Sequence, residues 1–205
     1  VLGDNTATDV DAAANIFYVS TTGEDTETCG TSSSPCKTVQ AGINRAGSGD
    51  TVIVNSGTYN ECIVIPPGAE LGGVLVESNE FLTTGTVAGG AILEGLDVCS
   101  PESATPGPVA KVLDQSSLRG FAIENGGDSG VQGFGAVVIS NNLIGLNETS
   151  TVGGGIYLST GANLTNPQGQ AEIKENSIFT NTSGSHGAGI YVDASANGIP
   201  SLVTI

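Results

Sequence analysis

Acidic side chains are the most numerous ionisable groups in this sequence, with 21 Asp and Glu residues against five Lys and Arg. Glycoside hydrolysis needs two carboxylates that face one cleft, one of them kept protonated. The candidates are two close pairs, Glu94 with Asp97 and Glu172 with Glu175, and four separate residues, Asp114, Glu124, Asp128 and Asp193. None of them lies in a recognisable catalytic motif. The sequence therefore favours a charged, solvated surface over catalysis.

Basic and nucleophilic groups offer no stronger candidate. Lyase chemistry needs Arg or Lys as a base, and cations that neutralise the uronate substrate. Lys111 and Arg119 are the basic pair considered for this role, because they bracket a probable turn. We expect them to serve in packing and surface charge instead. His186 is the single histidine, and it lies in a glycine-rich turn, SGSHGAG, with no Ser or Cys motif around it. We predict no catalytic residue.

The chain has four cysteines, Cys29, Cys36, Cys62 and Cys99. A zinc site would need paired C-x-x-C or His spacings, which are missing, so disulfides are favoured and no metal site is predicted. Cys29 and Cys36 close a short loop, which leaves Cys62 for Cys99 by default. Disulfides indicate an oxidising compartment, so we expect a secreted or extracellular, cell-surface protein.

Two further groups of residues are candidate sites. Asn147, Asn163 and Asn181 each begin an Asn-x-Ser/Thr sequence. They are possible glycosylation sites, or turn residues of the kind that Asn, Ser and Thr favour. Tyr157 and Tyr191 occupy equivalent places in a repeat, and they form either a sugar platform or a surface ladder.

Charge and composition exclude several partners. The net charge of −16 repels nucleic acid and anionic membranes, and an acidic polysaccharide would need bridging cations. An acidic surface could bind Ca²⁺ weakly, without ligands that we can name, and no cofactor is expected. The sequence contains no apolar run long enough for a transmembrane segment. Gly is abundant at 31 residues while Trp and Met are absent, which favours a core of small aliphatic side chains.

The elements that would position these groups are short strands and one helix. Residues 1–15 suggest an extended arm, and residues 16–205 a single domain. A first strand is predicted at residues 16–20 and an amphipathic helix at 38–46, with Val39, Ile43 and Ala46 at helical spacing. From residue 51 onward, β-branched runs alternate with Gly, Asn, Ser and Pro.

An internal repeat organises these strands. An offset of 34 positions superimposes Ile144 on Ile178, Ile156 on Ile190 and Asn142 on Asn176, among other matches. We interpret each copy as one coil of three strands, with equivalent residues stacked about 4.8 Å apart. The Ile pairs would be interior ladders, and the Asn pair a turn ladder of hydrogen-bonded amides.

The N-terminal region has a specific order of parts over residues 16–62: FYVS, a Cys-closed loop, SPCKTVQ, GDTVIV and GTY. In this order it resembles the opening of bacterial right-handed parallel β-helix proteins of the pectin-lyase-like superfamily. The later GGGI and GAGI elements, with NSIFTN between them, resemble repeats of polymorphic outer-membrane proteins. The resemblance implies an all-β fold, a right-handed parallel β-helix (a β-solenoid with three strands per coil) with a short N-terminal capping helix.

The two ends of the solenoid are expected to be covered in different ways. The helix would cover the floor of the first coil, so losing Val39 or Ile43 should cost about 2–4 kcal/mol. At the other end, residues 202–205 read as a strand with no cap, which indicates a fragment or an end covered by another copy.

We therefore expect an extracellular, non-catalytic structural or adhesive β-helix protein that self-assembles head-to-tail into filaments. Its expected partners are other copies of itself, or extracellular matrix and polysaccharide. The alternative is a polysaccharide lyase, a glycoside hydrolase or a carbohydrate-binding β-helix.

Overall fold

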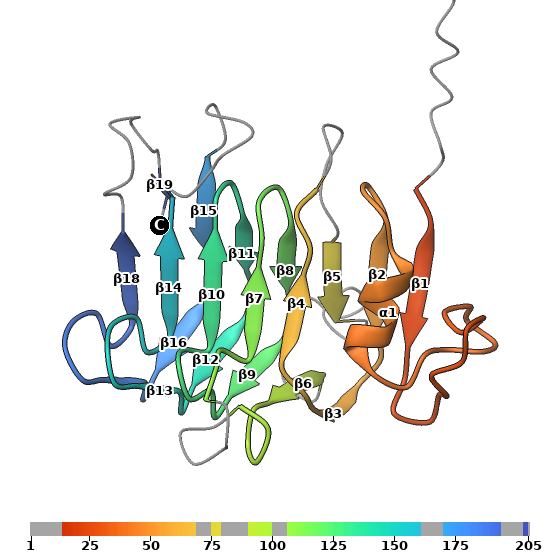
Figure 1. Ribbon diagram of the computed structural model, residues 1–205, viewed down its shortest axis with the longest axis horizontal. Helices are drawn as coiled ribbons and strands as arrows, with labels where there is room; N and C mark the ends of the chain where they lie inside the picture. The colour runs from red at the N-terminus through yellow and green to blue at the C-terminus, as the bar shows by residue number, and fades with distance from the viewer. Residues whose placement is uncertain are drawn as a thin grey trace, which may run out of the picture.

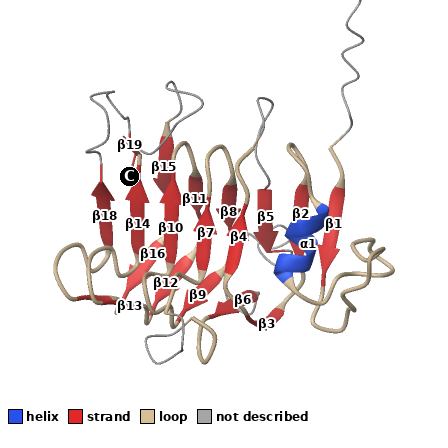
Figure 2. Cartoon of the chain, in the orientation of Figure 1, coloured by secondary structure: helices blue, strands red, loops and turns tan. Residues whose placement is uncertain are grey.

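The protein consists mostly of β-strands in parallel sheets, with one helix in the described residues (Figures 1 and 2). This computed structural model describes residues 14–68, 75–78, 90–99, 106–160, 170–193 and 203–204. The all-β class expected from the sequence is confirmed. Most of the predicted arm, residues 1–13, lies outside the described residues.

Three sheets carry almost all of the strands. Sheet I has the order β1 (Ile16–Val19), β2 (Thr51–Val54), β5 (Leu75–Ser78), β8 (Ser117–Arg119), β11 (Val138–Ser140), β15 (Ala171–Lys174) and β19 (Val203–Thr204). Sheet II has the order β3 (Gly57–Asn60), β6 (Ala91–Glu94), β9 (Ala122–Glu124), β12 (Leu143–Gly145) and β16 (Ser177–Phe179). Sheet III has the order β4 (Ile63–Ile65), β7 (Ala110–Val112), β10 (Val131–Phe134), β14 (Ile156–Ser159) and β18 (Ile190–Asp193).

Strands that follow one another along the chain belong to different sheets. The chain passes from β8 in sheet I to β9 in sheet II and β10 in sheet III, and then returns to sheet I with β11. A short additional pair, β13 (Glu148–Thr149) and β17 (Thr182–Ser183), lies between sheets II and III in chain order. Each strand therefore pairs with the strand one full passage earlier or later.

The 34-residue repeat is confirmed where the sequence placed it. Ile144 pairs with Ile178 and Ile156 with Ile190, in parallel register. Other passages differ in length: Val131 pairs with Ala110, 21 positions earlier, whereas Ala110 pairs with Ile63, 47 positions earlier. The strands stay short while the loops between them vary, so 34 residues is the spacing of some passages and not of the whole fold.

The core is a column of aliphatic side chains on the inner faces of the three sheets. Side chains alternate between the two faces of each strand, so every second one points into the core. Leu93, Ile123 and Ile144 of sheet II are all fully buried. In sheet III, Ile156 and Leu158 of β14 are buried in the same way, with Tyr157 between them on the outer face. The small, β-branched composition suits this narrow interior.

Tight corners at the ends of sheet II use left-handed backbone. Asn125, Leu146 and Thr180 directly follow β9, β12 and β16, and their φ angles are 60°, 58° and 49°. Asn tolerates this conformation, whereas Leu and Thr are strained in it. The corner geometry is therefore imposed on two of the three residues by the stacked strands.

Helix α1 (Val39–Arg45) covers the end of the core nearest the N-terminus (Figure 1). Val39 and Ile43 are buried, as predicted, and the side chain of Thr38 accepts a hydrogen bond from the Ala41 N–H. The Glu61 carboxylate also accepts hydrogen bonds from the Val39 and Gln40 N–H groups, at 2.7 and 2.9 Å. The helix start is thus held by a side chain from the coil that it covers.

The helix also protects an edge strand. The Gln40 amide donates to the Val64 carbonyl at 3.2 Å, and its oxygen accepts from the Val64 N–H at 2.7 Å. Because β4 is the edge of sheet III, this pair of bonds replaces those of a neighbouring strand.

The buried face of α1 gives the first prediction. Ile43→Ala should lower the free energy of unfolding by about 2–4 kcal/mol, because it leaves a cavity beneath the cap. Asn44→Ala, at an exposed position of the same helix, is the control and should change it by less than about 0.5 kcal/mol. Urea unfolding followed by circular dichroism measures both, and equal losses would contradict the capping role.

The strained corner gives the second prediction. Leu146→Asn should raise the free energy of unfolding by about 0.5–1 kcal/mol, because Asn accepts left-handed backbone more readily. Leu96→Asn is the matched control: Leu96 and Leu146 are both 53% exposed, and Leu96 does not have a positive φ. Thermal unfolding of both variants checks this, and stabilisation by both would point to a surface effect instead.

Candidate functional site

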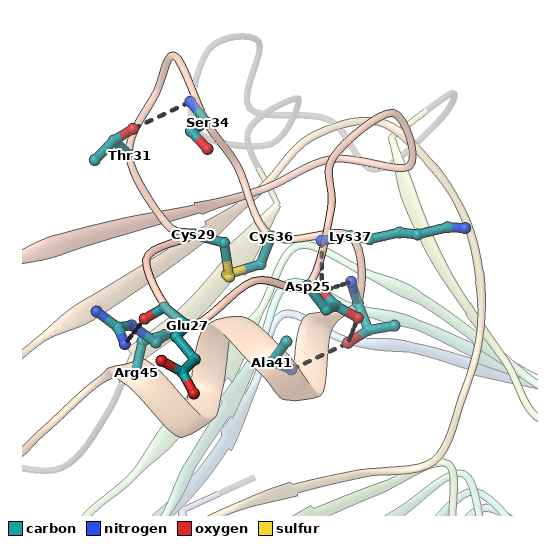
Figure 3. The surroundings of a disulfide bond; sticks show 10 residues. Asp25, Glu27, Cys29, Thr31, Ser34, Cys36, Lys37, Ala41 and Arg45 are labelled. Carbon is teal, nitrogen blue, oxygen red and sulfur yellow. Dashed lines mark hydrogen bonds between the residues drawn. A yellow bond between two sulfur atoms is a disulfide. The ribbon is translucent and has the colours of Figure 1, made fainter.

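The four cysteines form two disulfides, Cys29–Cys36 and Cys62–Cys99. The first closes the loop between β1 and α1 (Figure 3). The second joins the corner between β3 and β4 to the turn after β6, across 37 positions. Disulfide bonds are compatible with an extracellular protein.

The loop around Cys29 also places three potential metal ligands together. Ligand atoms of Asp25, Cys29 and Cys36 lie within 4.8 Å of one another. The two sulfur atoms are bonded to each other, and Asp25 accepts hydrogen bonds from the Lys37 N–H, the Thr38 N–H and the Thr38 hydroxyl. These groups staple the loop to the start of the helix, so the cluster is structural.

The fold pairs two carboxylates that the sequence analysis did not pair. Glu94 and Glu124 are register partners on neighbouring strands β6 and β9, on the outer face of sheet II. Burial and the charge of Glu94 raise the pKa of Glu124. One oxygen of Glu94 accepts hydrogen bonds from the Asn125 amide at 2.7 Å and the Leu96 N–H at 3.1 Å. Because 30 positions separate the two residues, only the strand register reveals their contact.

The other charged candidates have structural partners. Glu172 pairs with Lys174 at 2.7 Å, and Glu175 accepts from the Asn141 amide at 2.8 Å. Asp114 accepts from the Ala136 N–H at 2.8 Å, and Asp128 binds the side chains of Thr149 and Gln132. Arg119 forms an ion pair with buried Glu77 at 2.9 Å. Asp97 lies in the turn after β6, and His186 is exposed beside Ser185, as expected.

The Asn residues of the predicted turn ladder bond along the stack. The Asn142 amide donates to the Asn176 side chain at 3.0 Å, and the Asn147 amide donates to the Asn181 side chain at 2.9 Å. Asn147 is only 1% exposed, and its Nδ2 also donates to two backbone carbonyls, those of Ile123 and Gly145. A glycan on this nitrogen is incompatible with the fold.

The other two Asn-x-Ser/Thr sequences begin at Asn181, which the structure describes, and at Asn163, which it does not. The Asn181 Nδ2 donates to the Ile144 carbonyl at 2.9 Å, but the residue is partly exposed. Asn163 lies outside the described residues. The geometry therefore supports the turn-residue interpretation for Asn147 and leaves glycosylation of the other two as a prediction.

The two tyrosines lie on the outer face of sheet III. Tyr157 and Tyr191 are register partners, their ring centroids are 6.0 Å apart, and their planes differ by 11°. The Phe134 ring lies 6.1 Å from Tyr157, and the Lys111 Nζ lies 4.9 Å from the Phe134 centroid. We call Phe134, Tyr157 and Tyr191, from β10, β14 and β18, the aromatic row.

Polar groups border the aromatic row. The Tyr157 hydroxyl donates to Asp193 at 3.4 Å, and Gln132 is the register partner of both Lys111 and Tyr157. Burial, followed by the charge of Asp193, raises the pKa of Tyr157, so the phenol stays protonated at neutral pH. Phe134 is the member of the row that the sequence did not single out. Phe134 pairs in register with Ser159, whereas Gln132 pairs with Tyr157, so Phe134 lies diagonally from Tyr157 and no repeat offset aligns it with the tyrosines.

No protein-family model, curated protein or solved structure matches this chain. Within the described parts of the chain, no helix has the length and apolarity needed to cross a membrane. The superfamily resemblance of the N-terminal region therefore stays a prediction.

Asp25 gives a pH-dependent prediction. Desolvation alone would raise the pKa of this carboxyl, but the hydrogen bonds from Thr38 and Lys37 outweigh it and lower the pKa below the ordinary 3.8. The ionised group therefore stabilises the folded state above pH 3.8, and this contribution is lost as the pH falls through the lowered folded-state pKa.

Asp25→Asn should flatten this part of the acid unfolding curve, because an amide does not titrate there. Thermal unfolding at a series of pH values from neutral to strongly acidic measures the effect in the variant and the unmodified protein. An unchanged acid dependence in the variant would show that Asp25 does not contribute.

Proposed function

We propose that the protein is an extracellular, non-catalytic structural or adhesive β-solenoid, built as a right-handed parallel β-helix. The passage of the chain through sheets I, II and III in a constant order, with parallel pairing throughout, supports three strands per coil. Right-handedness is supported by the strong preference of parallel crossover connections for that hand. The resemblance of residues 16–62 to the pectin-lyase-like superfamily agrees with this proposal.

The proposal that the protein is non-catalytic rests on the hydrogen bonds that its carboxylates accept. Among the described residues, Asp25, Asp50 and Glu61 accept hydrogen bonds from backbone N–H groups of the cap and its neighbouring loops. Catalytic carboxylates must instead face a substrate. Among the described residues, Glu94 and Glu124 are two carboxylates in strand register, and a Glu94 oxygen is already bound by two donors.

Self-assembly is supported by apolar side chains near both ends of the strand stack. On the inner faces of the last described passage, Ile178, Ile190 and Val192 are only partly buried, whereas the register partners of the preceding passage are fully buried. At the capped end, Ile16 and Val64 of the edge strands are 51% and 44% exposed. Gln40 already bonds the Val64 backbone, so a neighbouring copy would contact these side chains without adding a strand to β4. Side-chain contact between the two ends would cover both sets.

Carbohydrate binding is a second candidate function, because the aromatic row is ordered on an outer face. The two functions are compatible, since an adhesive rod needs a surface that recognises its target.

The assembly is tested by sedimentation velocity and negative-stain electron microscopy over a range of protein concentrations. The unmodified protein should form end-to-end filaments, and Val64→Glu should weaken assembly by roughly tenfold by placing a charge in the contact. Leu96→Glu, at a similarly exposed position away from the edge strands, should assemble normally. Discrete rods at every concentration would overturn the filament proposal.

The absence of catalysis is tested separately. Neutral and acidic polysaccharides, incubated with and without Ca²⁺, should show no new reducing ends and no unsaturated uronate absorbance. Cleavage that is abolished by Glu124→Gln would assign an enzymatic role to the pair Glu94 and Glu124 and contradict the proposal.

A further inference from the structure

We infer that the aromatic row on the outer face of sheet III binds a neutral polysaccharide chain that lies across successive strands. This inference rests on the proposed adhesive function and names the class of ligand for it. The row consists of Phe134, Tyr157 and Tyr191, bordered by Lys111, Gln132 and Asp193.

The spacing of the rings suits a polymer. Consecutive centroids are 6.1 and 6.0 Å apart, and each ring comes from the next strand of the sheet. The two tyrosine rings are nearly parallel, at 11°, and the Phe134 ring is tilted by 54° to Tyr157. Three neighbouring rings offer successive contacts to a ligand whose own units repeat, whereas a single small molecule would use only one of them. The three rings follow one another from strand to strand, so a polymer that contacts all of them would lie across the strands.

The rings also keep apolar surface available. Carbon atoms in full contact lie about 3.5–4.0 Å apart. A centroid distance of 6.0 Å between nearly parallel rings therefore means that Tyr157 and Tyr191 overlap only in part. All three rings are partly exposed. The C–H faces of sugar rings are apolar and pack against aromatic surface of this kind.

Hydrogen-bonding groups lie where sugar hydroxyls would need them. The Tyr157 hydroxyl and the Asp193 carboxylate are adjacent at 3.4 Å, and Gln132 lies in register beside Tyr157. This combination of donors and acceptors at the border of an apolar strip is typical of sites that bind uncharged polar ligands.

Charge selects a neutral polymer over an anionic one. The chain carries a net charge of −16, and Asp193 lies directly at the row. Lys111 is the cation at this site, and it is already placed over the Phe134 ring. A polyuronate or a nucleic acid would meet repulsion along its whole length.

Affinity gel electrophoresis of the full chain tests the inference, with galactomannan, xyloglucan and polygalacturonate as the probes. A neutral polysaccharide should retard the unmodified protein, and polygalacturonate should not. Tyr191→Ala should raise the dissociation constant roughly tenfold, as expected for the loss of an aromatic anchor. Phe179→Ala is the matched control, because Phe179 is a 46% exposed ring on sheet II, outside the row. It should bind like the unmodified protein.

Tyrosine fluorescence provides a second measurement that does not depend on a variant. The chain has four Tyr and no Trp, so tyrosine emission is directly visible. Galactomannan or xyloglucan should change this emission in a saturable way. The Tyr157→Phe variant, which keeps the ring, should fold normally and retain much of the binding.

Three results would overturn the inference: no retardation and no fluorescence change with either neutral polymer, preferential binding of polygalacturonate, or equal losses in Tyr191→Ala and Phe179→Ala. Capture of a protein partner that requires Tyr191, without sugar binding, would also overturn it. These failures are distinguishable from failure of the proposed function, because filament assembly and the lack of polysaccharide cleavage are measured independently of the aromatic row.

Discussion

Parallel, in-register stacking of short strands is the constraint on which the rest of this structure depends. Each strand lies beside the strand one passage earlier, so each residue lies beside its register equivalent. Ile144 therefore meets Ile178, Asn147 meets Asn181, and Tyr157 meets Tyr191. Side chains that interact favourably with their own kind, such as aliphatic groups, amides and aromatic rings, are suited to such a stack.

The same constraint creates two problems that the fold must solve locally. An edge strand exposes unpaired backbone, and at β4 the side chain of Gln40 bonds the Val64 backbone in place of a strand. Tight corners require left-handed backbone, which Leu146 and Thr180 adopt despite its cost. Disulfides and the hydrogen bonds of the Asp25 carboxylate secure the loops that the stacked core does not hold.

The proposed function rests on the groups that lie on the outer faces. The carboxylates near the cap and its loops are hydrogen-bonded to backbone, whereas sheet III presents a row of partly exposed rings. The proposed adhesive rod, with a neutral polysaccharide as its ligand, would account for the row, the strong acidity and the disulfides together. Acidity would keep such rods apart from anionic polymers while leaving the neutral ligand unaffected.

The sequence by itself determined the local elements: the strand at Ile16, the helix with Val39 and Ile43 on its buried side, the presence of disulfides, and the 34-residue partners Ile156 and Ile190. These follow from propensity, spacing and a repeat of constant length. Only the tertiary structure decided that Glu94 meets Glu124, that Phe134 joins the tyrosines, and that Asn147 is buried. The physical reason is that loops of different length separate the strands. Partners 21 positions apart in one passage and 34 in another cannot be aligned by a single offset, so their contacts exist only once the strands have paired.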